Sequence, residues 1–267
     1  MLTRVIKYLL WATAFTPLIV TWSAIFPFVF GKIVFFRVLM ELAFAVALIW
    51  FFYELRRPTE AGVKIITTKL NFFKKNFLVI SVGLFFLSLI LSTIFAFDRY
   101  YAFWGNLERG EGLWSLGHFI MFFLLTVFFF EKKDWFTFFK LSIGVGFILV
   151  FYAILEYLGV RGFPFTPSQS TRPGSLIGNP AFLATHMLFL IGYAFILIFD
   201  NSFIGVDGLK PKIKSIWPWI SWFMILAAVP MIFLTGTRGA ILGLAVGISV
   251  VVLYLAFTKN ANVLDLN

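Results

Sequence analysis

The stretch Asn76–Phe97, NFLVISVGLFFLSLILSTIFAF, decides the fold class of this chain. It runs for 22 residues without a charged side chain. A helix needs about 20 mainly apolar residues to cross a bilayer, and only helices and closed barrels satisfy their own backbone hydrogen bonds in lipid. Barrel strands alternate apolar and polar residues over about 10 residues. This continuous run therefore predicts a transmembrane helix.

The composition of the whole chain points the same way. Of its 267 residues, 61% are hydrophobic and 13% are charged. Soluble domains carry about 25% charged residues and disordered chains have low hydrophobicity, so both classes are excluded. The chain has no Cys and only two His, which excludes disulfides, a thiolate nucleophile and Cys-based metal sites. We therefore expect no metal and no cofactor.

Eight apolar stretches are long enough to cross a membrane. They cover about residues 8–30, 33–55, 76–97, 113–130, 135–159, 180–199, 216–234 and 239–257. The first is too long for a signal peptide and lacks a small-residue cleavage pattern. The sequence thus predicts an all-α, polytopic integral membrane protein with about eight transmembrane helices, forming one transmembrane domain over residues 1–267.

The basic residues of the loops predict the orientation. Fourteen Lys and Arg lie on the side that holds both chain ends, and six lie on the other side. Because cytoplasmic loops are enriched in Lys and Arg, we expect both termini in the cytoplasm and a multi-pass protein of the cell (cytoplasmic or inner) membrane. The net charge of +10 then reflects topology, and no nucleic-acid partner is expected.

The two sides differ in the kind of basic residue. The cytoplasmic set is mostly Lys, whereas the outer set is Lys32 and five arginines, namely Arg99, Arg109, Arg161, Arg172 and Arg238. Arginine presents a planar fork that matches carboxylate and phosphate oxygens. The outer arginines therefore pair with loop acids, or they bind an anionic ligand.

Arginines also lie where helices start on the outer side. In this topology every even-numbered span begins outside, where its N-terminal amides attract anions and disfavour cations. Yet Arg37, Arg109, Arg172 and Arg238 lie at or near these four starts. A phosphate or pyrophosphate bound between them explains this placement, and structural acids explain it equally well.

Several ionisable groups fall inside the expected spans, where they are expensive and often functional. Arg37 and Glu41 are four residues apart, so they share a helix face and can pair. Glu156 can act as an acid or base, or pair with Arg161. His118 and His186 lie below the outer edge, and a lone membrane histidine is more often a hydrogen-bonded interior residue than a catalyst.

Three outer segments carry motifs. They are DRYYAFWGNLERGEG at 98–112, STRPGSLIGNP at 170–180 and LTGTRGA at 234–240. Each has a structural interpretation: interfacial aromatic residues in the first, an Asn179 N-cap with Pro180 at the first helical position in the second, and a Thr237 cap beside Gly239 in the third.

Taken together, these segments resemble the O-antigen ligase and O-antigen polymerase-related membrane proteins. The resemblance extends to the Phe26–Glu41 region around the first two spans and covers most of residues 25–245. It implies a metal-independent glycosyltransferase that moves a glycan from a polyprenyl-pyrophosphate donor to a glycan or lipid acceptor at the extracytoplasmic face. Such an activity belongs to cell-surface polysaccharide assembly.

The resemblance also implies roles for particular residues. The pyrophosphate is the leaving group, and outer arginines stabilise its growing charge. The expected pyrophosphate ligands are Arg37, Arg109, Arg172 and Arg238. The expected supporting polar residues are Glu41, Arg99, Glu156, Asn179 and His186.

The chain departs from the family at its end. Family members continue into a large outer loop with a histidine thought to activate the acceptor, and no outer loop here contains a histidine. We assign no catalytic base and expect an incomplete or split chain, with a possible partner chain supplying the rest. The alternatives are a non-catalytic lipid-glycan-binding subunit and a lipid or anion transporter, although the inverted repeats and broken helices of transporters are not visible.

Overall fold

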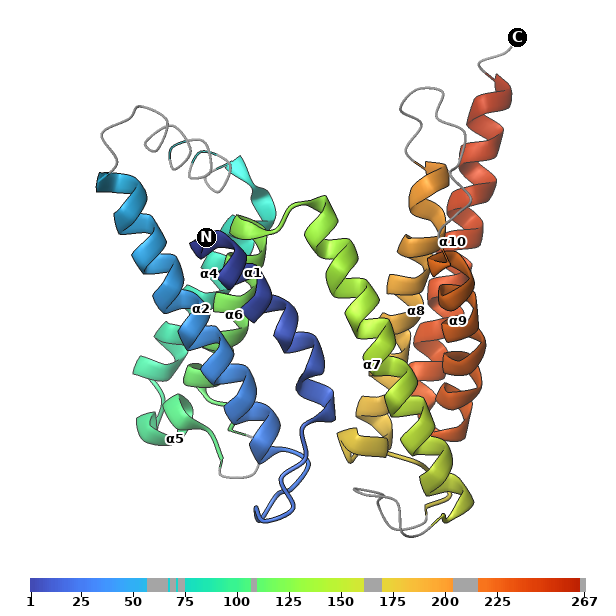
Figure 1. The fold of residues 1–267 in the computed structure, drawn as a ribbon, viewed down its shortest axis with the longest axis horizontal. Helices are drawn as coiled ribbons and strands as arrows, with labels where there is room; N and C mark the ends of the chain where they lie inside the picture. Colours follow the sequence, from blue (N-terminus) through green and yellow to red (C-terminus); the bar gives the residue numbers. More distant parts are fainter. Residues whose placement is uncertain are drawn as a thin grey trace. The chain divides into compact units, whose positions relative to one another are not determined.

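The computed structural model describes residues 1–56, 67, 71, 75–106, 110–160, 170–203 and 216–264. Within these residues the secondary structure is helical, joined by turns, and contains no strand (Figure 1). The chain divides into two compact units, Met1–Leu141 and Ser142–Asn267, each of which is described by itself.

Both units are built from helices. The first unit holds α1 (Leu2–Ala12), the 3-10 helix η1 (Thr13–Leu18), α2 (Phe30–Arg56), α4 (Phe77–Ile94), α5 (Arg99–Trp104) and α6 (Leu113–Phe129). Helix α7 (Lys132–Leu158) begins in the first unit and continues into the second. The second unit adds η2 (Ser175–Ile177), α8 (Pro180–Phe203), α9 (Trp217–Leu234) and α10 (Arg238–Leu264).

Five helices are long and apolar enough to cross a membrane: α2, α4, α7, α8 and α9. Two shorter apolar helices are α6 and the Arg238–Leu253 part of α10. The prediction of an all-helical, multi-pass membrane protein is thereby confirmed. The number of eight spans and the cytoplasmic termini stay predictions.

The first expected span differs from the helix that forms. Instead of one helix over residues 8–30, α1 ends at Ala12 and η1, which contains Pro17, follows it directly. Proline lacks a backbone N–H and clashes with the preceding turn, so the α-helix does not continue. At about 1.5 Å per residue for α1 and about 2.0 Å for η1, the two together rise about 28 Å, close to the thickness of a hydrocarbon core.

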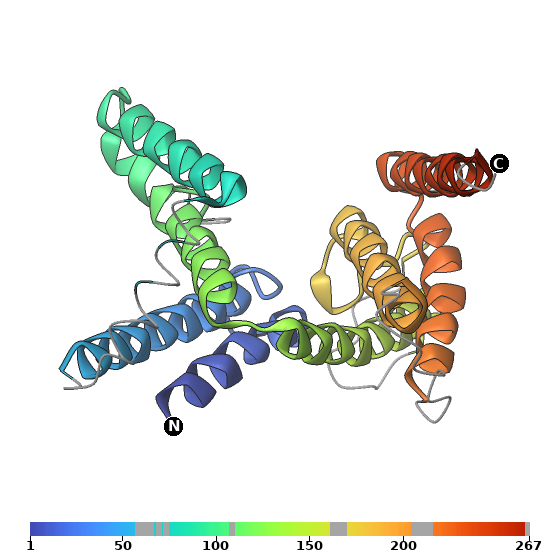
Figure 2. The same ribbon diagram turned by 90° about the horizontal axis from the view of Figure 1, so that it is seen from above.

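The core of the first unit lies between α1, α2 and α6. Ile6 and Leu10 of α1 pack in one buried cluster with Met40 and Ala43 of α2. Near the other end of α2, Trp50 meets an α6 ring edge-on. Figure 2 shows α4 alongside α6, and the two helices are in contact.

A buried carboxylate ties α1 to the start of α7. Lys7 Nζ lies 2.6 Å from Asp134 Oδ2, and Asp134 is 3% exposed. Trp11 Nε1 donates to the backbone oxygen of Asp134 at 3.1 Å. These contacts fix the first turn of α7 against α1 within the first unit.

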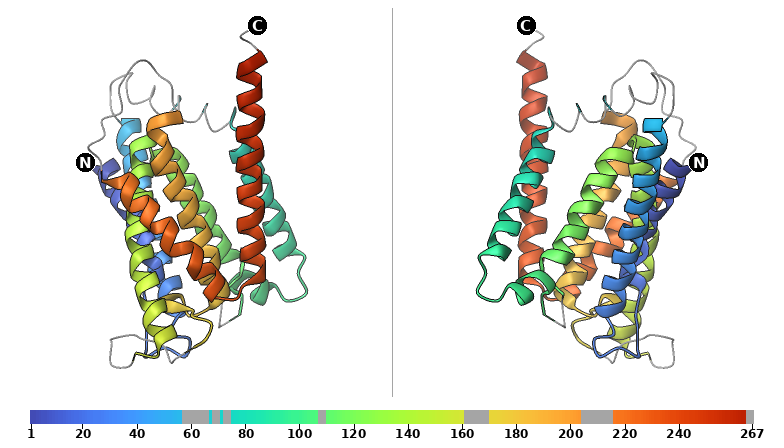
Figure 3. Two further views of the ribbon diagram at one scale, coloured as in Figure 1. Left: turned by 90° about the vertical axis from the view of Figure 1, so that its right-hand side faces the viewer. Right: turned by 90° about the vertical axis from the view of Figure 1, so that its left-hand side faces the viewer.

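In the second unit α8 packs along α9, and α10 packs against both (Figure 3). Helix α7 approaches through Gly146, where an added Cβ would lie 2.4 Å from Leu190 Cδ1 and 3.2 Å from Met224 Sδ. Small residues allow such close approach between membrane helices.

Candidate functional site

Two of the three arginine-bearing motifs meet in the second unit. Arg172 lies in the turn before α8, and its Nε donates to the backbone oxygen of Thr235 at 2.8 Å. Thr235 begins the turn that leads into α10 at Arg238. Both arginines are exposed, and within the described part of the chain neither forms an ion pair. The interpretation that structural acids neutralise these two cations is therefore not supported there.

The carboxylate of Glu156 is hydrogen-bonded to the turn that carries Arg172. Glu156 of α7, 5% exposed, accepts from the backbone N–H of Gly174 at 3.0 Å and of Ser175 at 2.8 Å through Oε2. The Ser175 hydroxyl donates to the backbone oxygen of Leu149 at 2.7 Å. Glu156 thus stabilises the turn that carries Arg172. Arg161, its predicted alternative partner, lies outside the described residues.

The Pro-Gly-Ser sequence is suited to this turn. An added Cβ at Gly174 would lie 2.7 Å from Asn179 N, so only glycine fits without a backbone shift. Ser175 has φ +54° and Gly178 has φ +83°, and the first of these is uncommon for a residue with a side chain. Asn179 Oδ1 accepts from Ala181 N at 2.8 Å, and α8 begins at Pro180. The predicted N-cap is confirmed.

The turn between α9 and α10 leaves room for the Arg172 side chain beside Gly236. Gly236 has φ +62°, and an added Cβ there would lie 3.3 Å from Arg172 Nε. Thr235 is fully buried, and its hydroxyl donates to Ile232 O at 2.7 Å. The Thr-Gly-Thr-Arg sequence therefore provides Thr235 O, which orients Arg172, and places Arg238 three residues after Thr235.

In the first unit, Arg37 and Glu41 lie close enough to interact electrostatically, and each also contacts a residue in or just before α6. Arg37 Nη2 donates to Ser115 Oγ, and lies 3.4 Å from the backbone oxygen of Gly110. Ser115 also donates to that oxygen. One turn deeper, Glu41 Oε1 lies 3.2 Å from His118 Nε2. The predicted neighbours Arg37 and Glu41 thus interact electrostatically, and each adds a contact across to α6.

Both ring nitrogens of His118 have a hydrogen-bond partner. His118 is 2% exposed, and its Nδ1 lies 2.7 Å from the backbone oxygen of Trp114. Its Nε2 faces the Glu41 carboxylate. The expectation of a hydrogen-bonded interior histidine fits this geometry.

The loop that contains Arg109 is closed at its base by two glycines. Gly105 has φ +77°, and an added Cβ would lie 2.5 Å from the backbone nitrogens of both Glu111 and Gly112. At Gly112 an added Cβ would lie 2.3 Å from Phe103 O. The two glycines therefore allow the backbone that enters the loop and the backbone that leaves it to lie in direct contact. Arg109 itself lies outside the described residues.

The remaining predicted residues occupy separate positions. Arg99 is exposed at the start of α5, where Asp98 accepts from Tyr101 N at 2.9 Å and caps the helix. His186 lies on α8, and its Nε2 is buried without a hydrogen-bond partner among the described residues. The structure unites Arg172, Glu156, Asn179 and the Arg238 turn in one unit, and Arg37 with Glu41 in the other. A common cavity for all of the arginines stays a prediction.

Sequence reasoning missed Ser115 and the true partner of Glu41. The signal is present in the spacing, since Ser115 and His118 are three residues apart on α6 and Arg37 and Glu41 are four apart on α2. Both spacings place polar groups on one helix face one turn apart.

Metal ligands do not gather in this structure: no group of three His, Asp or Glu residues suited to a metal occurs among the described residues. Comparison of the chain with protein-family models, curated proteins and solved structures finds no match.

Proposed function

We propose that this chain binds polyprenyl-pyrophosphate-linked glycans at the extracytoplasmic face of the cell membrane and acts in their transfer, as an O-antigen ligase or polymerase-like glycosyltransferase. One observation carries the proposal. Arg172 is oriented by Thr235 O next to Arg238, and both exposed guanidinium groups are without an ion pair among the described residues. One oriented fork with a second exposed arginine three residues after its backbone partner suits the oxygens of a pyrophosphate.

The chemistry needs charge stabilisation and a place for one proton. The acceptor hydroxyl attacks the anomeric carbon of the donor glycan, the bond to the lipid pyrophosphate breaks, and the hydroxyl proton passes to water. Negative charge grows on the departing pyrophosphate, and preorganised arginine donors at the edge of an apolar region stabilise it. The expected ligands are Arg172, Arg238, Arg109 and Arg37.

A second candidate is a subunit that binds the donor without transferring the glycan. It is favoured because the candidate acid–base groups Glu156, Glu41 and His118 already have hydrogen-bond partners. Glu156 accepts two backbone N–H groups, and Glu41 and His118 bind each other. A group already engaged in this way is poorly placed to take the acceptor's proton, so a partner chain would supply the base.

One reconstitution separates these functions. The full chain is placed in liposomes with a radiolabelled glycan on a polyprenyl pyrophosphate and a hydroxyl acceptor. Label in the acceptor supports transfer by this chain alone, and label retained on bound donor supports the binding subunit. Movement of intact donor across the bilayer with no stable binding would contradict both and indicate a transporter.

A further inference from the structure

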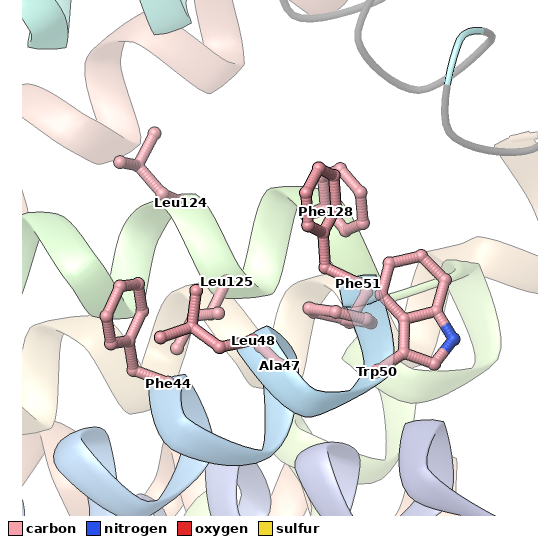
Figure 4. Close-up of a pocket in the computed structure, with 9 residues that line it drawn as sticks. Phe44, Ala47, Leu48, Trp50, Phe51, Leu124, Leu125 and Phe128 are labelled. Carbon is pink, nitrogen blue, oxygen red and sulfur yellow. The ribbon is translucent and has the colours of Figure 1, made fainter. Parts of the chain in front are cut away.

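The two units differ in what their buried surfaces offer. In the first unit, a groove between α2 and α6 is lined by apolar and aromatic side chains, among them Phe44, Trp50 and Phe128 (Figure 4). Apolar contacts have no direction, so this groove does not select an occupant. In the second unit, the fully buried Ser175 makes two directed hydrogen bonds to α7.

Two groups of α7 converge on Ser175. Its N–H donates to Glu156 Oε2 at 2.8 Å, and its hydroxyl donates to Leu149 O at 2.7 Å. Leu149 and Glu156 are seven residues apart and so lie on nearly the same helix face. Helix carbonyls point toward the C-terminus, whereas side chains lean toward the N-terminus. The Leu149 oxygen and the Glu156 carboxylate therefore meet at one place on α7, and Ser175 occupies it.

The backbone conformation of Ser175 favours a different residue. Its φ of +54° lies in the left-handed region, which a residue with a side chain adopts at a cost and glycine adopts freely. The Glu156 bond is made to a backbone N–H and does not depend on the side chain. The bond to Leu149 O is the contribution that requires a hydroxyl, and it offsets the cost of the conformation.

Little freedom of rotation separates Ser175 from Arg172. The ring of Pro173 fixes its φ at about −65°, and the N–H of Gly174 donates to the same carboxylate oxygen as that of Ser175. The attachment of Ser175 to α7 therefore determines where the backbone of Arg172 lies. From there the Arg172 side chain reaches Thr235 O through Nε at 2.8 Å.

We propose that Ser175 is a positioning residue, whose hydroxyl bond to α7 sets the orientation of the Arg172 guanidinium. The inference rests on the proposed function in one respect, because it takes this guanidinium as a ligand of the pyrophosphate. It adds a residue that never touches the ligand and acts through Arg172.

The test follows the Arg172 Nε–H proton by NMR, with the full chain in lipid nanodiscs. The resonance is assigned by its absence in Arg172→Lys, and its exchange with solvent reports the bond to Thr235 O. Ser175→Gly removes the hydroxyl and relieves the backbone, whereas Ser175→Ala removes the hydroxyl and keeps the conformational cost. Ser221→Ala is the matched control, because Ser221 is fully buried in the same unit and its Oγ has no hydrogen-bond partner among the described residues.

Exchange of the Arg172 Nε–H should accelerate at least about fivefold in both Ser175 variants, as expected for the loss of one hydrogen bond, and should not change in Ser221→Ala. A lower unfolding temperature with unchanged exchange would show a purely structural role and overturn the inference. Slow exchange in Ser175→Gly beside fast exchange in Ser175→Ala would assign the effect to the backbone conformation and overturn it as well.

A measurement on the unmodified chain does not depend on the folding of any variant. The Arg172 Nε–H should exchange at least about fivefold more slowly than that of Arg4, which is exposed on α1, because it is bound to Thr235 O. Equal rates would show that Arg172 is not held in this orientation, and the inference would fail.

Binding of a long-chain polyprenyl pyrophosphate separates the inference from the proposed function. Both Ser175 variants should bind it at least about threefold more weakly than the unmodified chain, and Ser221→Ala should bind it equally well. Undiminished affinity in Ser175→Gly despite faster exchange would overturn the link between orientation and ligand. Failure of the unmodified chain to bind, with the exchange results as expected, would contradict the proposed function and leave the positioning of Arg172 by Ser175 supported.

Discussion

At the scale of single residues, arginines of the motifs are held by backbone oxygens and a hydroxyl. Arg172 binds Thr235 O, and Arg37 binds Ser115 and Gly110 O. Neutral acceptors orient a guanidinium without cancelling its charge. This holds for Arg172 among the described residues, whereas Arg37 also has the Glu41 carboxylate nearby.

The Glu41–His118 contact makes a first prediction. His118→Ala removes a buried partner and should lower the free energy of unfolding by about 1–3 kcal/mol. Thermal unfolding in detergent measures the effect. Glu41→Gln keeps a hydrogen-bonding side chain of the same size and should cost less. An unchanged melting temperature in His118→Ala would show that the contact does not stabilise α2 against α6.

The close backbone contact between Gly105 and Gly112 leads to a second prediction. Gly105 has φ +77° and ψ −170°, a region almost restricted to glycine, so Gly105→Ala should cost at least about 1–3 kcal/mol. Gly83→Ala is the control, because nothing lies within 4 Å of an added Cβ there and a mid-helix alanine is favoured. Similar unfolding curves for the two variants would contradict a close backbone contact at Gly105.

At the scale of elements, the sequence predicts what depends on one segment. The apolar runs locate most helices, and Asn179-Pro180 marks the start of α8 because capping is local. The expected first span over 8–30 differs from the structure because the apolar pattern continues through Pro17, whereas α1 ends at Ala12 and a 3-10 helix that contains Pro17 follows. The four-residue spacing predicts the proximity of Arg37 and Glu41 but misses Ser115, because Ser115 belongs to another helix.

The turn that carries Arg172 makes a third prediction, at this scale. Glu156→Ala removes the acceptor of the Gly174 and Ser175 N–H groups, so their hydrogen exchange should accelerate by at least tenfold, which corresponds to about 1.4 kcal/mol. Glu156→Gln retains one acceptor oxygen and should give a smaller effect. Exchange rates that do not change in Glu156→Ala would mean that the turn forms without this carboxylate.

At the scale of the whole molecule, topology decides which loops can meet a substrate outside the cell. The chain has no Cys, so single cysteines report their own accessibility. Ser170→Cys should react with a membrane-impermeant thiol reagent in intact cells, and Lys75→Cys, in the expected cytoplasmic loop before α4, should react only after the membrane is opened. The reverse pattern would invert the orientation and place Arg172 in the cytoplasm.

A common role of the arginines stays a prediction from their positions at helix starts. The orientation of Arg172 and Arg37 could not be predicted, because it depends on Thr235 O, Ser115 and Gly110 O, which come from distant parts of the chain. Glu156 likewise lies on a different segment from the amides that it binds. The spacing of polar residues marks a helix face, but which faces meet follows from packing, which no local pattern encodes.

The most direct test is equilibrium binding of a long-chain polyprenyl pyrophosphate to the full chain in nanodiscs. Arg172→Ala and Arg238→Ala should each weaken binding at least roughly tenfold, since each removes a charge-assisted contact of about 1.5–3 kcal/mol. Arg172→Lys should bind with intermediate affinity because it keeps the charge and loses the fork. Arg4→Ala, an exposed position on α1, should have no effect. Unchanged affinity in both Arg172→Ala and Arg238→Ala would contradict the account.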